Sequence, residues 1–125
     1  KMGTFFGGMT LEQLGGLLKV HGVKADVHKA ERTNVDEFRR LARENLHRPG
    51  DFVLINYLRK SIDQKTGGHI SPVAAYDAGS DRFLVLDVAD FKYPPVWVET
   101  KRLFDSMNTK DSSSGCSRGF VLVSE

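Results

Sequence analysis

Residues 67–95 read GGHISPVAAYDAGSDRFLVLDVADFKYPP, and this stretch decides the fold that we expect for the chain. Its two limbs, His69 to Tyr76 and Arg82 to Val88, are apolar and partly β-branched, as is typical of strands. The DAGSD segment between them has the composition of a tight turn. The sequence therefore predicts a β-hairpin.

The expected register of this hairpin brings a histidine close to an aspartate. If Tyr76 faces Arg82 across the turn, His69 faces Ala89, and Asp87 is the diagonal neighbour of His69 on the same face. Diagonal neighbours lie roughly 7–8 Å apart, a span that an imidazole and a carboxylate can bridge with one hydrogen bond. Such a carboxylate would fix the tautomer of the ring and stabilise the imidazolium, as in a catalytic dyad. The alternative is a polar pair at a strand end without a catalytic role, because slips of one residue in register are easily made.

The same residues, extended to GGHISPVAAYDAGSDRFLVLDVADFKYPPVWV, closely resemble the GHxSPxxxY…LDVARFKYPPxWV stretch of phytochelatin synthases. The helix that begins TNVDEFRRL, the strand before GGH and the closing SRGFVLVS resemble the family in the same order and spacing. The resemblance implies a papain-like fold, of which this chain is the half with the antiparallel sheet. It also implies an enzyme that forms a cysteine acyl-enzyme from glutathione, releases glycine and passes γ-Glu-Cys to another glutathione or a phytochelatin, in heavy-metal detoxification.

The resemblance assigns roles to four residues of this sequence. His69 and Asp87 match the catalytic histidine and aspartate of the family. Asp111 and Arg118 match the aspartate and arginine that hold the γ-glutamyl end of the donor glutathione. Their chemistry suits this role, because a carboxylate accepts from an α-ammonium group and a guanidinium binds a carboxylate through two parallel hydrogen bonds. On composition alone, Asp111 and Arg118 would be ordinary surface charges.

The family nucleophile is a cysteine at the start of a helix, and it precedes the histidine in the chain. The single cysteine here, Cys116, follows His69 and Asp87 and lies in the Ser/Gly loop KDSSSGCS. We interpret Cys116 as a loop thiol that a metal ion could touch. We expect the nucleophile in a preceding segment or a companion chain, so residues 1–125 would be one part of a phytochelatin synthase catalytic domain and inactive alone.

One departure from the family concerns the second half of the reaction. Asp90 stands where the family often has arginine, and a reversed charge three residues from Asp87 would weaken binding of an anionic second glutathione. Two alternatives therefore stay open. The first is a glutathione-deglycylating cysteine peptidase, in which water takes the acyl group. The second is a non-catalytic module that binds γ-glutamyl groups.

Composition excludes several other classes of protein. The 125 residues, 40% of them apolar, suffice for one domain with a modest core. The 18 basic and 16 acidic residues are spread along the chain and leave a net charge of +2, so we expect neither a nucleic-acid nor a membrane partner. No apolar run approaches the roughly 20 residues of a membrane span, and no signal-peptide pattern is present. We expect a soluble, cytoplasmic protein.

The sequence also predicts which ligands and partners the chain has. One cysteine and four histidines without paired spacing argue against a metal site built by the protein, and we expect no cofactor for the chemistry. As implied by the resemblance, heavy-metal ions such as cadmium or zinc are expected as thiolate complexes of the substrate or as activators. The expected partners are glutathione, γ-glutamyl peptides, the cysteine-bearing segment and a second copy in a homodimer.

The remaining stretches predict an α+β fold, because helices and strands alternate along the chain. Thr10 and Gln13 form a capping box at the start of the first helix, and Trp97 is expected as a core anchor. The other predicted elements are a helix to about His21, a strand over Lys24–Lys29, a helix from Val35 to about His47, a strand over Phe52–Tyr57, a helix over Lys101–Met107 and a strand over Phe120–Val123.

Overall fold

The computed structural model describes residues 10–58, 68–86, 94–111 and 115–124. The fold is α+β, as the sequence predicts. In chain order, the elements are α2 (Leu11–Val20), β1 (Lys24–Lys29), the 3₁₀ helix η1 (Ala30–Arg32), α3 (Val35–Leu46), β2 (Phe52–Leu58), β3 (Gly68–Asp77), β4 (Arg82–Val85), β5 (Val96–Glu99), α4 (Thr100–Met107) and β6 (Gly119–Ser124).

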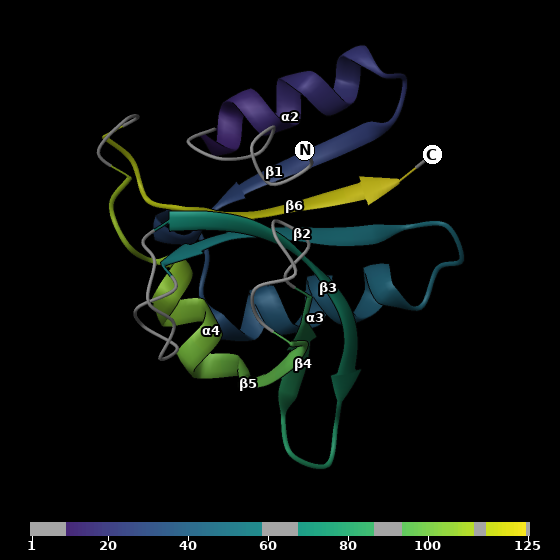
Figure 1. The fold of residues 1–125 in the computed structure, drawn as a ribbon, viewed down its shortest axis with the longest axis vertical. Coiled ribbons are helices and arrows are strands. Elements are labelled where there is room, and N and C mark those ends of the chain that lie inside the picture. Colours follow the sequence, from purple (N-terminus) through teal and green to yellow (C-terminus); the bar gives the residue numbers. More distant parts are fainter. Residues whose placement is uncertain (1–9, 59–67, 87–93, 112–114, 125) are drawn as a thin grey trace.

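The strands form one antiparallel sheet in the order β1-β6-β2-β3-β4-β5. The last strand, β6, lies between β1 and β2, so the C-terminal strand pairs with the edge strand β1 from the N-terminal part of the chain (Figure 1). Helix α2 covers one face, and helices α3 and α4 cover the other. The molecule therefore has three layers.

Strand β2 shows how the core is divided between the two faces. Val53, Ile55 and Tyr57 are fully buried among side chains of α3 and α4. Leu54, between them in sequence, packs in the other cluster with Leu11 of α2. Because side chains alternate along a strand, the apolar run FVLINYL buries both faces.

The first helix begins as its sequence predicts and packs closely against β1. The Thr10 hydroxyl accepts from the Gln13 N–H at 3.1 Å, and the Gln13 side chain accepts from the Thr10 N–H at 3.0 Å, which completes the capping box. A Cβ at position 15 would lie 2.5 Å from the Val27 Cγ2 atom. The absence of a side chain at Gly15 therefore lets α2 lie directly against β1.

The predicted hairpin register is wrong by one residue at the turn. Asp77, and not Tyr76, pairs with Arg82. A β-bulge directly after Val73 then shifts the pairing, and Val73 faces Val85 as the predicted register requires. The bulge inserts one extra residue on β3 and so compensates the error at the turn.

Pro72 gives a physical reason for the early end of β4. The Leu86 N–H donates to the Pro72 carbonyl oxygen at 3.0 Å. Proline has no N–H with which to return this bond, so the ladder lacks its second hydrogen bond at that point. The regular strand ends at Val85, whereas the sequence predicts a limb that continues to Val88; residues 87–93 lie outside the described part.

The prediction that Trp97 anchors the core is wrong. Trp97 is 46% exposed, whereas its neighbour Val98 is only 4% exposed. Both belong to the edge strand β5, where alternate residues point to opposite faces. Val98 faces the core under α4, and Trp97 lies on the other face with its cross-strand partner Leu84.

Candidate functional site

Two of the predicted site residues lie at the same end of the sheet. Strands β3 and β6 both pair antiparallel with β2, so they run parallel to each other. Asn56 of β2 pairs with Gly119 on one side and with Ile70 on the other. Arg118 directly precedes Gly119, and His69 directly precedes Ile70. Positions 118 and 69 are therefore two strand spacings apart, or about 10 Å.

The predicted dyad is only partly within the described residues. The backbone of His69 pairs with Tyr57 in the β2–β3 ladder. Asp87 and Asp90 lie outside the described residues, so the dyad and the effect of Asp90 remain predictions. Within the GGHISP motif, Ser71 is fully buried, and its Oγ lies 3.3 Å from the Tyr57 hydroxyl. Ser71 thus ties the histidine-bearing strand to β2.

Asp111 and Arg118 stand on facing limbs of a short ribbon. Residues 109–111 run antiparallel to residues 116–118, and the backbone N–H groups of Asp111 and Arg118 each donate to the opposite limb at 2.8 Å. Because Arg118 faces position 109, Asp111 is its diagonal neighbour across the ribbon. The structure therefore brings these two residues together, on facing limbs of the stretch that the sequence indicated as a Ser/Gly loop.

The guanidinium of Arg118 is held along one side. Its Nη1 atom donates to the Thr109 hydroxyl at 3.0 Å and to the Lys110 carbonyl oxygen at 2.9 Å. Among the described residues, neither Nε nor Nη2 donates a hydrogen bond. One edge of the group is thus fixed to the protein, and the other faces no described partner.

Contacts with η1 fix the second limb of the ribbon. The Glu31 carboxylate accepts from the Ser117 N–H at 2.9 Å, and the Ser117 hydroxyl accepts from the Glu31 N–H at 3.0 Å. The Ala30 N–H donates to the Arg118 carbonyl oxygen at 2.8 Å. Sequence reasoning missed this clamp, since its residues are 86 positions apart and no motif links them.

Cys116 lies on the same ribbon, beside the end of β1. The thiol is half-buried, and Lys29 Nζ lies 3.5 Å from its sulfur atom. Lys29 also forms an ion pair with Glu12 at 3.2 Å, and hydrogen bonds to Glu12 and then to Cys116 raise the pKa of Lys29. Cys116 thus lies on the second limb of the ribbon, next to Lys29. Its interpretation as a loop thiol without a catalytic role remains a prediction.

A second polar cluster, around Asp81, was not predicted. The two carboxylate oxygens accept from Arg39 Nε at 2.9 Å and Nη2 at 2.8 Å, and Oδ1 also accepts from the hydroxyls of Tyr76 at 2.6 Å and Thr100 at 2.8 Å. The bonds to Arg39 hold the pKa of Asp81 well below its ordinary value. Arg43 lies 4.7 Å above the Tyr76 ring. The charged face of α3 therefore takes part in tertiary contacts through Arg39 and Arg43.

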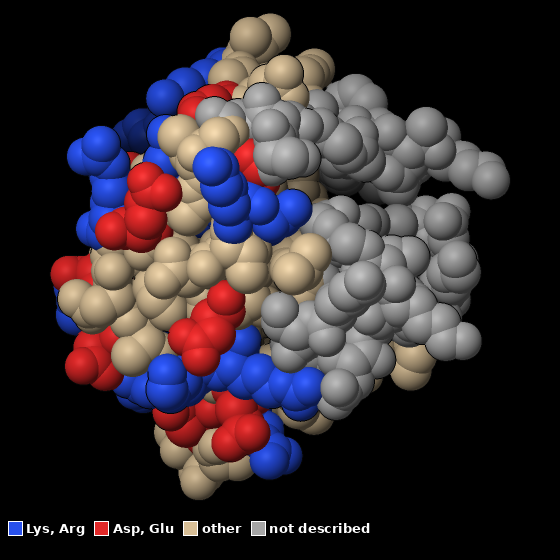
Figure 2. Space-filling view, turned by 90° about the vertical axis from the view of Figure 1, so that its left-hand side faces the viewer, with Lys and Arg blue, Asp and Glu red and all other residues tan. Residues whose placement is uncertain are grey.

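The surface adds little that points to another site. Figure 2 shows acidic and basic side chains interspersed over one face of the molecule. Within the described ranges, no group of three or more histidine, cysteine or acidic side chains is placed to hold a metal ion. None of the helices in the described part is long and apolar enough to cross a membrane.

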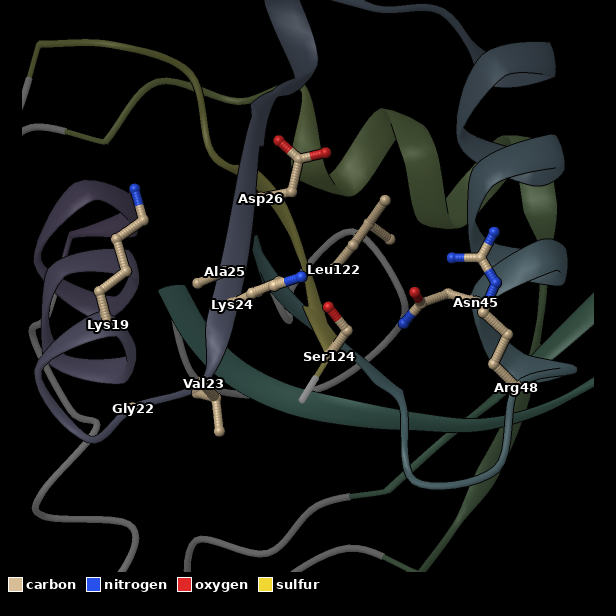
Figure 3. A pocket seen from close by; sticks show the side chains of 10 residues that line it. All are labelled: Lys19, Gly22, Val23, Lys24, Ala25, Asp26, Asn45, Arg48, Leu122 and Ser124. Atoms are coloured by element: carbon tan, nitrogen blue, oxygen red, sulfur yellow. The ribbon is translucent and has the colours of Figure 1, made fainter.

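The structure has a surface hollow of about 570 Å³ at the opposite end of β6 (Figure 3). It contains none of the four predicted site residues, and it lies beside Ser124, whereas Arg118 precedes the other end of the strand. The residues that line it come from α2, β1, α3, β6 and adjoining turns: Lys19, Gly22, Val23, Lys24, Ala25, Asp26, Asn45, Arg48, Leu122 and Ser124.

Comparison with known proteins defines the class of this chain. A family model described as phytochelatin synthase matches residues 6–120. Glutathione gamma-glutamylcysteinyltransferase 1 of Lotus japonicus is 37% identical over 117 residues, which cover 94% of this chain and 23% of the relative. Glutathione gamma-glutamylcysteinyltransferase 2 of Arabidopsis thaliana is 38% identical over 103 residues (82% and 23%), and the enzyme of that name from Schizosaccharomyces pombe is 34% identical over 116 residues (93% and 28%).

The chain therefore belongs to the phytochelatin synthase family. It spans about a quarter of the length of these curated relatives.

Proposed function

We propose that this chain supplies the catalytic histidine and aspartate and the donor-binding residues of a glutathione γ-glutamylcysteinyltransferase with a papain-like fold. The names of the relatives support this proposal. The observation that carries it is the arrangement of the strand ends, in which positions 69 and 118 lie about 10 Å apart on parallel strands. In the proposal, residues 1–125 are one part of the catalytic domain, and a cysteine from another segment or chain supplies the thiolate.

The proposed reaction has two half-reactions. The thiolate attacks the carbonyl carbon of the Cys–Gly amide, and the imidazolium of His69 protonates the departing amine, so that glycine leaves and a thioester to γ-Glu-Cys remains. Asp87 orients the imidazole and stabilises its charged form. In the second half-reaction, neutral His69 takes a proton from the α-amine of another glutathione as that amine attacks the thioester. The cysteine then departs as the thiolate.

The donor end of the site follows from the ribbon. We assign the α-carboxylate of the γ-glutamyl group to the Nε–Nη2 edge of Arg118, which has no bonding partner in the described part of the chain, and its α-ammonium group to Asp111. An extended γ-Glu-Cys unit is longer than an ordinary dipeptide, which spans about 7 Å, because the γ linkage adds backbone bonds. Its length is thus suited to the distance of about 10 Å between positions 118 and 69.

Heavy-metal ions enter this proposal on the substrate side. Cadmium or zinc would arrive as thiolate complexes of glutathione, or act as activators, because soft thiolate ligands bind these ions well. A cytoplasmic location suits this chemistry, since the reducing cytosol keeps thiols free.

The test uses the protein that carries this chain, isolated from its source, with its intact mass measured to show which segments it contains. It is incubated with glutathione, with and without cadmium, and glycine and peptide products are quantified. The proposal predicts glycine release and a product with two γ-Glu-Cys units. If γ-Glu-Cys is the only peptide product, the enzyme is a deglycylating peptidase, as the acidic residue at position 90 would favour. Absence of glycine release would contradict both enzyme functions.

A further inference from the structure

We propose that Thr109 is a positioning residue that aims the Nε–Nη2 edge of Arg118 at the α-carboxylate of the γ-glutamyl donor. This inference rests on the proposed function, because it specifies how one residue of the donor site is held. It concerns a threonine that no sequence motif singled out.

The bonds of Arg118 determine which edge is available. A guanidinium group has five N–H donors, of which Nη1 carries two. These two are used by the Thr109 hydroxyl at 3.0 Å and the Lys110 carbonyl oxygen at 2.9 Å. Nε and Nη2 together present a planar fork whose spacing matches the two oxygens of a carboxylate. The side chain is therefore oriented for bidentate binding along one particular edge.

The direction of each hydrogen bond at Thr109 is determined by chemistry. Its hydroxyl lies 2.9 Å from the Ser106 carbonyl oxygen, which can only accept, so the single hydroxyl proton must point to Ser106. The lone pairs then remain to accept from Arg118. Ser106 is fully buried, and its own hydroxyl donates to the Leu103 carbonyl oxygen at 2.6 Å. The orientation of the guanidinium is thus set by the C-terminal end of α4.

The backbone of the ribbon does not depend on this hydroxyl. The N–H of Arg118 donates to the carbonyl oxygen of Thr109, and the carbonyl oxygen of Arg118 accepts from Ala30. Thr109→Val keeps these bonds and the shape of the side chain but removes the acceptor for Nη1. Thr109→Ser keeps the acceptor. The pair of variants therefore separates guanidinium orientation from ribbon structure.

The experiment measures equilibrium binding of glutathione to the protein that carries this chain, in a His69→Ala background where the proposed chemistry is blocked. Thr109→Val should weaken binding about three- to tenfold, the range expected for one lost hydrogen bond. Thr109→Ser should bind like the parent. The second ligand is γ-aminobutyryl-Cys-Gly, which lacks the α-carboxylate, and Thr109→Val should not change its affinity.

The matched control is Thr33→Val. Thr33 is also half-buried, and its hydroxyl also donates to a backbone carbonyl oxygen, that of Ala30, at 3.3 Å, but it is not a hydrogen-bond partner of the Arg118 guanidinium. It should leave the affinity for both ligands unchanged. If Arg118→Lys weakens glutathione binding but Thr109→Val does not, the inference is overturned and the donor site stands. An equal loss for both ligands in Thr109→Val would also overturn it. If neither Arg118→Lys nor Thr109→Val changes the affinity, the donor site and the inference both fail.

Discussion

Two arginine clusters of this fold differ in how completely their hydrogen bonds are satisfied. At the hairpin turn, Arg39 and Asp81 form a bidentate pair, and Tyr76 and Thr100 donate further hydrogen bonds to the same carboxylate. At the ribbon, Arg118 uses only Nη1, and its other edge meets no acceptor among the described residues. Arg39 and Asp81 are 42 positions apart in the sequence, whereas Arg118 bonds to residues eight and nine positions away.

The difference separates a structural role from a binding role. The Asp81 cluster closes on itself and ties the β3–β4 turn to α3 and to the start of α4, so its bonds serve the fold. In the Arg118 cluster, Nη1 is bonded to the protein and the Nε–Nη2 edge meets no acceptor within the described ranges, which is the arrangement that a preorganised ligand site needs. We therefore expect substitutions in the first cluster to change stability and substitutions in the second to change affinity.

The largest effect should come from neither cluster but from the residue assigned to the chemistry. In the protein that carries this chain, His69→Ala should lower the rate of glycine release by about a thousandfold or more, because proton transfer to and from the reacting groups is lost. Asp87→Asn should lose much of the rate while keeping the fold, since the imidazole would favour the wrong tautomer. Rapid-quench kinetics with glutathione measure both. A near-normal rate for Asp87→Asn would mean that Asp87 has no catalytic role and is only a polar residue at a strand end.

The next effect tests the open cluster. Arg118→Lys keeps the charge but loses the planar fork, so the affinity for donor glutathione should fall about ten- to a hundredfold with little change in the free energy of unfolding. Asp111→Asn should cause a comparable loss, and the double variant should lose less than the sum because both side chains hold one ligand end. Titration calorimetry on the four proteins gives the affinities. If the affinity is unchanged in both single variants, Arg118 and Asp111 are surface charges on the ribbon and do not bind the donor.

A smaller effect, on stability, tests the closed cluster. Asp81→Asn keeps the side-chain shape and tolerates the positive φ of 53° at this position. It should lower the free energy of unfolding by about 1–2 kcal/mol, a modest loss because the side chain is 45% exposed and solvent screens the pair. Affinity for glutathione should not change. Urea unfolding measures the first quantity, and an affinity loss without a stability loss would reverse the roles assigned to the clusters.

The pH dependence of stability gives the same cluster a second test. The pKa of Asp81 is held below its ordinary value of 3.8 in the folded state, chiefly by Arg39. The stabilisation is therefore fully present above pH values near 4 and is lost as the pH falls below that range. The stability difference between the parent and Asp81→Asn should shrink between pH 6 and pH 2.5. A constant difference over this range would show that the charge of Asp81 contributes nothing.

The smallest effect is expected at Cys116. Cys116→Ser should leave glycine release by the protein that carries this chain unchanged, and the isolated 125-residue chain should release no glycine with either residue. Lys29 keeps its ion pair with Glu12 in the variant, so stability should also change little. Glycine release by the isolated chain that disappears in Cys116→Ser would show that this thiol is the nucleophile.

The parts of the fold that depend on neighbouring residues could be predicted from the sequence. Thr10 and Gln13 lie within one turn of each other and together specify where the first helix starts. The runs of apolar residues in β2 and β6 correctly indicate that these strands are buried. The exposure of Trp97 could not be predicted, because it depends on which face of an edge strand the helices cover. The register at the turn, where Asp77 pairs with Arg82, and the bulge after Val73 that compensates for it could not be predicted either, because no residue type at these positions specifies them.

The residues of the candidate site also fall into those that the sequence indicated and those that it did not. A resemblance in sequence pointed to Asp111 and Arg118, but nothing local indicated that Thr109 holds the guanidinium or that Glu31 clamps the ribbon. These contacts form only when α4, η1 and β6 are assembled. Sequence reasoning therefore found the residues expected to touch the ligand and missed those that position them.

The most direct test of the central claim compares the two arginines by NMR. The side-chain Nε–H signals of Arg118 and Arg39 are followed in the protein that carries this chain, in the His69→Ala background, as glutathione is added. We predict that the Arg118 signal shifts in a saturable way, because its Nε–Nη2 edge takes up the α-carboxylate, and that the Arg39 signal stays unchanged, because Asp81 already occupies its fork. Saturable glutathione binding that leaves the Arg118 signal in place would contradict the account.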